Sequence, residues 1–296
     1  MSDIFLDEPV KTPSNEEPSP FVAFFKGMGY FLLFFACNTL VSVVFLFYFA
    51  YQKGLEYQVQ NIPLNMESIM EYAQDQIYVN SNLFIISYTI SFIVILALIF
   101  AFRRKNFFKE TQIRKISLGY LPSIIVISVG LMLFVNSVLN FLPRAWLANY
   151  MESSSFISSG TLLGSVLSQV IFAPFTEELA FRGMMLSRFN KAIPRWIGIA
   201  LSSFCFGLLH GELIWIIYAA LLGIVLSVIA NYTGSIVSSI LIHTLFNAFG
   251  TILSYLNVGI TLTVYGVMAP LGLILLIAGF IMLFKQPKAL PLGLAQ

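Results

Sequence analysis

The chain has 296 residues, of which 58% are hydrophobic and only 10% are charged, and its mean hydropathy is strongly positive. This composition excludes a soluble globular domain, and a net charge of +2 gives no basis for binding nucleic acid. The two cysteines, Cys37 and Cys205, lie within apolar stretches without a CxxC spacing, so we interpret them as buried thiols. The sequence therefore predicts a membrane protein.

Residues 1–20 are rich in acidic residues, proline and serine, and they lack the basic start and short apolar core of a cleavable signal peptide. Because such a segment is too polar to be buried, we expect a disordered cytoplasmic tail. We expect residues 21–288 to form a single transmembrane domain and residues 289–296 to form a short C-terminal tail.

Eight apolar stretches follow, each close to the roughly 20 residues that an α-helix needs to cross a bilayer core. Backbone groups in lipid have no water to bond, so these stretches should be helices. The predicted fold class is an all-α polytopic membrane protein with about eight transmembrane helices. The expected helices cover residues 29–52, 82–102, 118–142, 161–188, 194–210, 213–232, 235–256 and 261–284.

The basic residues indicate the orientation, because loops that remain in the cytoplasm are enriched in lysine and arginine. Basic residues gather between the second and third stretches, between the fourth and fifth, and after the eighth. With eight crossings, all of these groups share one side with the N-terminal tail, whereas Lys53 and Arg144 lie on the other side. We therefore predict that both termini are cytoplasmic.

Three charged side chains lie within the fourth stretch, where a charge at the middle of the bilayer costs roughly 3 kcal/mol on insertion scales. Glu178 and Arg182 are four residues apart, so they share a helix face and can pair. Glu177 points about 100° away and is expected to stay free of this pair. Pro174 removes a backbone hydrogen bond just before the two acids, which predicts a local opening of the helix. A purely structural cluster of charges is the alternative interpretation.

The two histidines of the chain also lie in apolar stretches, each four residues from a suitable neighbour. Phe206 and His210 share a face of the fifth stretch, and His243 and Asn247 share a face of the seventh. At about 1.5 Å per residue, both histidines, Asn247 and Glu177 fall at comparable depths, so their side chains can meet. A single histidine in a helix is usually a packing residue, but this coincidence favours an active site.

The sixth stretch carries small residues at four-residue spacing, Ala219, Gly223 and Ser227. Stripes of this kind let neighbouring membrane helices approach closely, and we interpret this stripe as packing alone.

In order along the chain, these polar residues resemble the three motifs of the CAAX protease and bacteriocin-processing family of membrane proteins, also called CPBP or Abi. The motif EExxxR is similar to Glu177-Glu178 with Arg182, FxxxH to Phe206 with His210, and HxxxN to His243 with Asn247. The resemblance covers about residues 160–250. Each motif is short, but three motifs in order that use both histidines are specific.

The family includes type II CAAX prenyl endopeptidases and bacterial members linked to bacteriocin maturation or self-immunity. The resemblance therefore implies an intramembrane endopeptidase, in the plasma membrane of a bacterium, that acts on a hydrophobic peptide or membrane-protein substrate. By that similarity, Glu177 and His210 would activate the attacking water, and His243 and Asn247 would bind the oxyanion. The residues implied as structural support are Glu178, Arg182 and Phe206.

General chemistry is compatible with these roles, because a carboxylate removed from water is a better base near neutral pH and donors in a dry cavity stabilise an oxyanion strongly. Glu177, His210 and His243 also have the ligand types of a three-ligand zinc site with water in the fourth position. The chain has no HExxH motif, and the same residues can work in a metal-free, glutamate-dependent site. The sequence leaves the cofactor open between Zn2+ and none.

Two functions of other classes stay open. A non-catalytic membrane regulator or immunity protein could keep the same fold and bind a peptide or a sensor kinase. A proton-coupled transporter would also use buried Glu and His side chains. Transporters usually have repeated halves with broken helices, and the sequence shows no internal repeat. Cleavage of a substrate by the purified protein would separate the enzyme from both alternatives.

Overall fold

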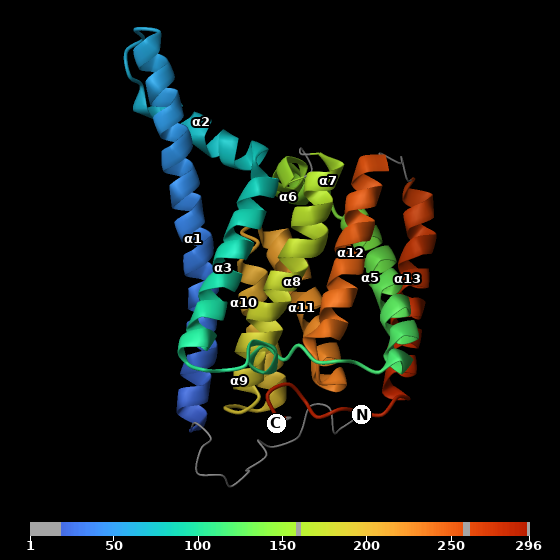
Figure 1. The fold of residues 1–296 in the computed structure, drawn as a ribbon. Helices are drawn as coiled ribbons and strands as arrows, with labels where there is room; N and C mark the ends of the chain where they lie inside the picture. Colours follow the sequence, from blue (N-terminus) through green and yellow to red (C-terminus); the bar gives the residue numbers. More distant parts are fainter. Residues whose placement is uncertain (1–18, 158–160, 257–260, 295–296) are drawn as a thin grey trace.

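The computed structural model shows a helical bundle and describes residues 19–157, 161–256 and 261–294, in which no strand occurs (Figure 1). The first half contains α1 (Pro20–Val59), α2 (Met66–Val79), α3 (Ser81–Phe102), α4 (Phe107–Glu110), the 3-10 turn η2 (Leu118–Tyr120), α5 (Leu121–Phe141) and α6 (Arg144–Ile157). The second half contains α7 (Leu162–Ser165), the π-helical segment η3 (Val166–Phe172), α8 (Ala173–Glu178), the π-helical segment η4 (Leu179–Leu186), α9 (Ser187–Phe189), α10 (Arg195–Leu208), α11 (Leu213–Thr233), α12 (Ile236–Leu256) and α13 (Leu262–Phe284).

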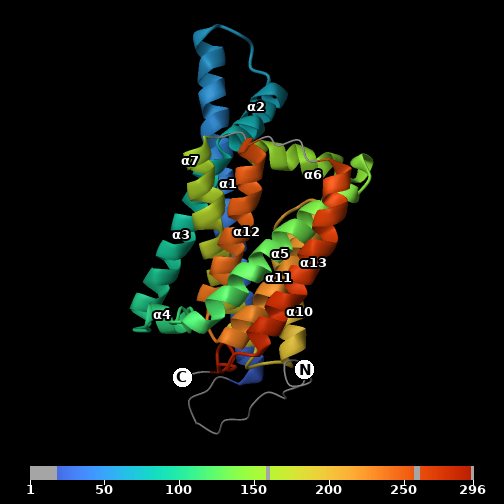
Figure 2. The ribbon, with the colours of Figure 1, turned by 90° about the vertical axis from the view of Figure 1, so that its right-hand side faces the viewer.

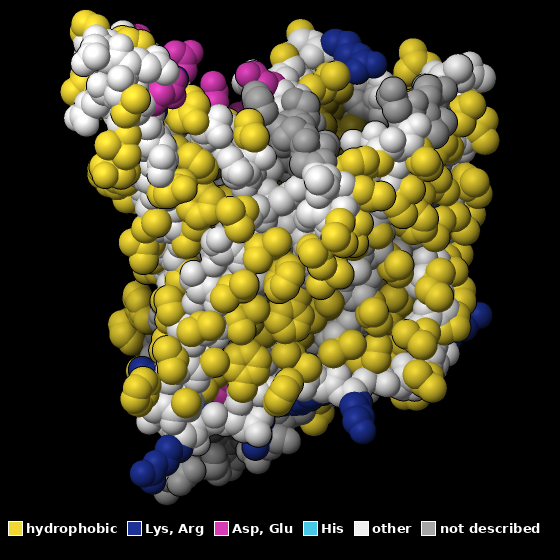
Figure 3. Space-filling view, turned by 45° about the horizontal axis from the view of Figure 1, so that its top comes forward, with side chains coloured by type: hydrophobic (Ala, Val, Ile, Leu, Met, Phe, Trp, Pro, Cys, Tyr) yellow, Lys and Arg dark blue, Asp and Glu magenta, His cyan; other side chains and the backbone are white. Residues whose placement is uncertain are grey.

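The predicted all-α membrane fold is confirmed. In the described part of the chain, six helices are long and apolar enough to cross a membrane, namely α1, α3, α5 with its preceding turn, α11, α12 and α13. Hydrophobic side chains cover the middle of the molecular surface, and charged side chains gather toward its ends (Figure 3). The chain is therefore a multi-pass integral membrane protein.

The predicted count of eight crossings is not confirmed. The fifth expected stretch forms α10, whose 14 residues extend only about 21 Å, less than the roughly 30 Å of a bilayer core. The fourth expected stretch, residues 161–188, is divided by η3 and η4 and is not one regular α-helix. All the residues of η4 are buried, so neighbouring helices surround this irregular backbone and lipid does not. Irregular helices are tolerated at membrane depth under that condition.

The helix opening that Pro174 predicts is present. Pro174 is the second residue of α8 and follows directly on η3, which is π-helical. Proline cannot donate the backbone hydrogen bond of a regular α-helix, and π-helical turns frequently occur at functional sites. The backbone is therefore irregular on both sides of the glutamate pair at the end of α8.

The first helix is longer than the expected 29–52. With 40 residues, α1 is about 60 Å long and projects beyond the bundle, and α2 slopes back from its end to α3 (Figure 1). The side chain of Asn65 caps α2 by accepting two backbone N–H bonds, and the hydroxyl groups of Tyr57 and Ser68 lie 2.8 Å apart. These contacts tie α2 to α1. Of the predicted disordered tail, residues 1–18 lie outside the described residues.

The two ends of the bundle differ. α6 lies across one end (Figure 2), and residues 285–294, which we call the C-terminal segment, run under the other end (Figure 1). In this segment Leu292 is fully buried, the N–H of Ala289 donates to the Tyr232 carbonyl at 3.0 Å, and the N–H of Gly293 donates to Gln112 Oε1 at 2.9 Å. The C-terminal segment thus joins the end of α11 to the loop after α4.

α5 and α13 pack against each other through glycines. A Cβ atom at Gly130 of α5 would lie 2.6 Å from the Leu276 backbone nitrogen and 2.9 Å from the Gly272 carbonyl oxygen. Small residues permit this close approach of two membrane helices.

We expect Gly130→Ala to lower the free energy of unfolding by about 1–3 kcal/mol, because the new methyl group would meet backbone atoms that cannot move alone. Gly29→Ala on α1 is the matched control, since a Cβ atom there meets nothing within 4 Å. Thermal melting of both variants in detergent measures the effect. Equal melting temperatures for the parent and both variants would contradict the close packing.

Candidate active site

The three sequence motifs converge inside the bundle. Their side chains are Glu177 and Glu178 at the end of α8, Arg182 in η4, Phe206 in α10 with His210 just after it, and His243 and Asn247 in α12. These segments lie side by side in the middle of the bundle, with α11 packed against α10, α12 and η4 (Figures 1 and 2).

Glu178 and Arg182 form the predicted ion pair. Arg182 Nη1–H donates to Glu178 Oε1 at 2.7 Å, and both side chains have no exposed surface. An isolated buried charge is strongly destabilising, so each partner makes the other tolerable in the interior. The four-residue spacing still brings the two together, although Glu178 ends α8 and Arg182 lies in a π-helical segment.

The other donors of Arg182 contact α11. Nε–H donates to Ser227 Oγ at 3.3 Å, and Nη2–H donates to the Gly223 carbonyl oxygen at 3.0 Å. A Cβ atom at Gly223 would lie 3.1 Å from Arg182 Nη2 and 3.0 Å from the Ser203 Cβ, so a side chain there would crowd the guanidinium. Interpreting the stripe that starts at Ala219 as packing alone is therefore wrong for two of its three residues, which hold Arg182.

His243 contacts both glutamates. Its Nδ1 lies 3.1 Å from Glu178 Oε1, and its Nε2 lies 3.7 Å from Glu177 Oε2. Because the shorter contact is to Glu178, Nδ1–H donates to that carboxylate and Nε2 faces Glu177. Glu177 takes no part in the ion pair of Glu178 with Arg182, and its rotation of about 100° on the helix brings it within reach of His243 on α12.

The ring of Phe206 is the packing centre of the site. The guanidinium carbon of Arg182 lies 4.5 Å from the ring centroid, and the rings of His210 and His243 lie at 5.2 and 5.8 Å. A cation over an aromatic face is attracted by the ring quadrupole, which adds to the support of Arg182. His210 Nδ1 lies 3.1 Å from the Phe206 carbonyl oxygen, so Nδ1–H donates there and Nε2 carries the lone pair.

Asn247 lies beside the π-helical segment η3. Its Nδ2 donates to the Gln169 carbonyl oxygen at 2.8 Å, which uses one of its two amide N–H bonds. Nothing in the sequence singles out Gln169, because its contribution is a backbone carbonyl in an irregular helix. Asn247 therefore also holds η3 against α12.

The three-ligand metal site that the sequence left open is not assembled. Within residues 19–157, 161–256 and 261–294, no three His, Cys, Asp or Glu side chains are grouped so that they could hold a metal ion. His243 contacts Glu177, whereas the hydrogen bond of His210 is to the Phe206 carbonyl oxygen of its own helix. The set of Glu177, His210 and His243 does not fit a zinc ion in this geometry.

The site has a buried half and an accessible half. Glu178 and Arg182 are fully buried and His243 is 3% exposed, whereas Glu177, His210 and Asn247 are partly exposed. The accessible groups are thus a carboxylate, an imidazole and an amide. A carboxylate can take a proton from water, and imidazole and amide N–H groups can stabilise an oxyanion.

Comparison with known proteins addresses the same region. The family model described as type II CAAX prenyl endopeptidase Rce1-like matches residues 159–249, which contain all seven of these residues. Neither the comparison with curated proteins nor the comparison with solved structures found a match. The family model thus confirms the resemblance carried by the three motifs, and residues 159–249 are similar to the Rce1-like CAAX proteases.

Proposed function

We propose that the chain is an intramembrane endopeptidase that hydrolyses a peptide bond of a hydrophobic or membrane-associated substrate. The observation that carries the proposal is the contact of Glu177 with His243 at 3.7 Å, beside a fully buried ion pair that fixes the other nitrogen of that imidazole. A role in packing alone would not explain why a partly exposed carboxylate lies beside an oriented imidazole. Catalysis explains it, because a general base must be accessible to water and must lie next to a positioned partner.

In the proposed reaction, Glu177 is the general base. A separation of 3.7 Å between Glu177 Oε2 and His243 Nε2 is too long for a good direct hydrogen bond, and a water molecule can bridge it. The water gives a proton to Glu177, and its oxygen bonds to the substrate carbonyl carbon, whose π electrons move to the carbonyl oxygen. The O–H that this water leaves on the carbon donates a hydrogen bond to His210 Nε2, and the oxyanion electrons re-form the carbonyl bond as the amine leaves. Glu177 returns its proton to the amine as the C–N bond breaks.

His243 and Asn247 stabilise the oxyanion in this proposal. The bond from His243 Nδ1–H to Glu178 sets the orientation of the imidazole, as acceptors behind an active imidazole commonly do. Both ring nitrogens carry a proton when Nε2 donates to the oxyanion. The second amide N–H of Asn247 is the other donor. Glu178, Arg182 and Phe206 are positioning residues, since they act through the imidazole.

The substrate class includes prenylated CAAX-type proteins and bacteriocin-like peptide precursors. The test is cleavage by the purified full chain, in detergent and in liposomes, of a prenylated CAAX peptide, its unprenylated counterpart and hydrophobic precursor peptides. We expect at least one peptide of the panel to be cleaved. No cleavage of any peptide by well-folded protein would favour a non-catalytic membrane regulator or immunity protein. Comparing small peptides from cells with and without the protein would identify the natural substrate.

We further propose that the end formed by α4, α9 and the C-terminal segment is cytoplasmic, in the plasma membrane of a bacterium. Of the fifteen basic residues in the described part of the chain, twelve belong to segments at that end, in agreement with the enrichment of cytoplasmic loops in lysine and arginine. The acidic helix α2 lies toward the opposite end (Figure 1).

In intact cells, we expect a membrane-impermeant thiol reagent to label Glu71→Cys on α2 and to leave Lys109→Cys on α4 unlabelled until the membrane is opened. Both positions are exposed, so accessibility differs only by side. The native Cys37 and Cys205 are buried, which keeps the background low. Labelling of Lys109→Cys from outside would reverse the proposed orientation.

A further inference from the structure

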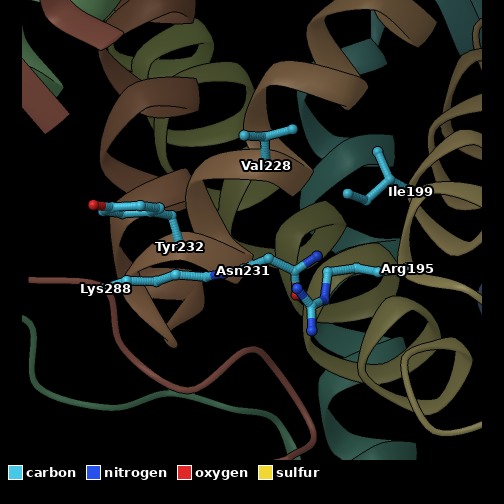
Figure 4. A pocket seen from close by; sticks show the side chains of 6 residues that line it. All are labelled: Arg195, Ile199, Val228, Asn231, Tyr232 and Lys288. Atoms are coloured by element: carbon cyan, nitrogen blue, oxygen red, sulfur yellow. The ribbon is translucent and has the colours of Figure 1, made fainter. Parts of the chain in front are cut away.

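Asparagine amides join separate segments of the chain at both ends of the bundle. At the end formed by α4, α9 and the C-terminal segment, Asn190 Nδ2 donates to Asn231 Oδ1 at 2.7 Å, and Asn231 lines a small pocket together with Lys288 (Figure 4). At the opposite end, Asn82 is the second residue of α3, next to α2 (Figure 1). The partners of Asn82 lie in α7 and η3, and η3 contacts Asn247 of the candidate active site.

The shortest hydrogen bond of Asn82 is with Ser168 of η3. Ser168 is fully buried, and its Oγ–H donates to Asn82 Oδ1 at 2.6 Å. The hydroxyl group of Thr176 in the following helix donates to the carbonyl four residues earlier in its own chain segment, whereas Ser168 donates across to α3. Two weaker contacts, each 3.5 Å long, join Asn82 Nδ2 to Ser165 Oγ and Gln169 Nε2 to Asn82 Oδ1. Asn82 therefore ties the start of the irregular helix to α3.

Pro174 leaves the carbonyl oxygen of Gln169 free for another donor. In the π-helical register of η3, the N–H of Ala173 donates to the Ser168 carbonyl, five residues earlier. The next donor in this register would be the nitrogen of Pro174, which carries no hydrogen. The Gln169 carbonyl oxygen accepts a hydrogen bond from Asn247 Nδ2 at 2.8 Å instead. The orientation of the Asn247 amide thus depends on where η3 holds this carbonyl.

The same segment is also tied to α12 at a second point. Ser165, the last residue of α7 before η3, has its Oγ 3.1 Å from the hydroxyl oxygen of Tyr255. Tyr255 lies about two turns after Asn247 along α12. Residues 165–169 are therefore held between Asn82 on α3 and two side chains of α12.

We propose that Asn82 is a positioning residue of the active site, an inference that rests on the role of oxyanion donor proposed for Asn247. Asn82 fixes Ser168 and thereby the neighbouring carbonyl of Gln169. That carbonyl holds one amide N–H of Asn247, so that the other N–H faces the oxyanion. Asn82 lies outside residues 159–249, the part of the chain that the family model matches. Because an oxyanion donor stabilises the transition state more than the bound substrate, its misplacement lowers kcat with little change in KM.

The test measures the kinetics of peptide cleavage by the purified full chain in liposomes. Leucine is close to asparagine in size and favourable in a membrane helix, but it cannot accept the bond from Ser168. In Asn82→Leu we expect kcat to fall about 10- to 100-fold with KM changed less than about twofold, since outright loss of an oxyanion donor costs roughly 100- to 1,000-fold. Asn136→Leu on α5 is the matched control, because the Asn136 amide donates to the Met132 carbonyl of its own helix. It should cleave at the parent rate.

Further variants separate positioning from a general loss of stability. Ser168→Ala removes only the hydroxyl group and should reproduce the fall in kcat, so it decides the question if Asn82→Leu does not fold. Because Asn82 acts through Asn247, Asn82→Leu should cause no further loss of kcat when it is added to Asn247→Ala.

The outcomes distinguish this inference from the proposed function. Unchanged kcat in Asn82→Leu and Ser168→Ala would overturn the positioning role of Asn82 while the endopeptidase activity stands. Losses from Asn82→Leu and Asn247→Ala that multiply in the double variant would overturn it equally, since Asn82 would then act independently of Asn247. No cleavage of any peptide by the folded parent would overturn the proposed function, and this inference with it.

Discussion

Glu177→Gln should leave the protein folded and lower the rate of peptide cleavage by about 100- to 10,000-fold, the usual contribution of a general base. Glutamine keeps the length and shape of the side chain, but its neutral amide cannot take a proton from water. The side chain is 15% exposed and contacts His243 at 3.7 Å, so the substitution removes the proton acceptor with little change in packing. The measurement is cleavage of a hydrophobic peptide in liposomes, together with thermal melting.

Glu71→Gln is the matched control, because Glu71 is an exposed glutamate on α2, distant from the site. It should cleave at the parent rate. If Glu177 only belongs to a structural charge cluster, Glu177→Gln will lower the melting temperature while each folded molecule still cleaves normally. Full cleavage by a well-folded Glu177→Gln protein would refute its role as the base.

Arg182→Ala should lower the free energy of unfolding by about 3–5 kcal/mol and reduce the yield of protein, because it leaves a buried carboxylate without its cation. Glu178 would keep its hydrogen bond with the His243 imidazole but no cationic partner of its own on η4. The variant also loses the bonds to Ser227 and Gly223, which join η4 to α11. Cleavage per folded molecule should fall as well, because the imidazole of His243 loses part of its support.

The double variant Glu178→Gln with Arg182→Met tests whether the unpaired charge of Glu178 causes the loss of stability in Arg182→Ala. It removes both charges at similar volume, so it should be more stable than Arg182→Ala, as neutral replacements of buried ion pairs usually are. Glu56→Gln, which breaks the exposed pair with Lys53 at 3.0 Å, should change the stability little. Chemical unfolding in detergent ranks the variants. Normal yield and melting of Arg182→Ala would contradict the buried pair.

Features that depend on spacing along one helix could be predicted from the sequence. Six of the eight expected apolar stretches correspond to helices long enough to cross a membrane, because a helix in lipid must satisfy its own backbone. The pair of Glu178 and Arg182 follows from a four-residue spacing, and the irregular backbone around Pro174 follows from its missing N–H. The three motifs were also enough to indicate the family that matches residues 159–249.

Contacts between helices could not be predicted in the same way, because they depend on how each helix is rotated and at what depth it packs. Only the tertiary structure shows that His243 contacts both glutamates and that Gly223 and Ser227 hold Arg182. Only the tertiary structure, within the described residues, shows that Glu177, His210 and His243 are not grouped closely enough to hold a metal ion.

The sequence by itself thus determined the all-α membrane fold and the pair of Glu178 with Arg182, and it singled out the polar side chains proposed for the site, since these follow from local hydropathy and from periodicity within single helices. The tertiary structure decided which of those side chains meet. It also decided that α10 is too short to cross alone and that Leu292 of the C-terminal segment is buried. These outcomes arise from the packing of segments that are distant in the sequence, and no local pattern encodes them.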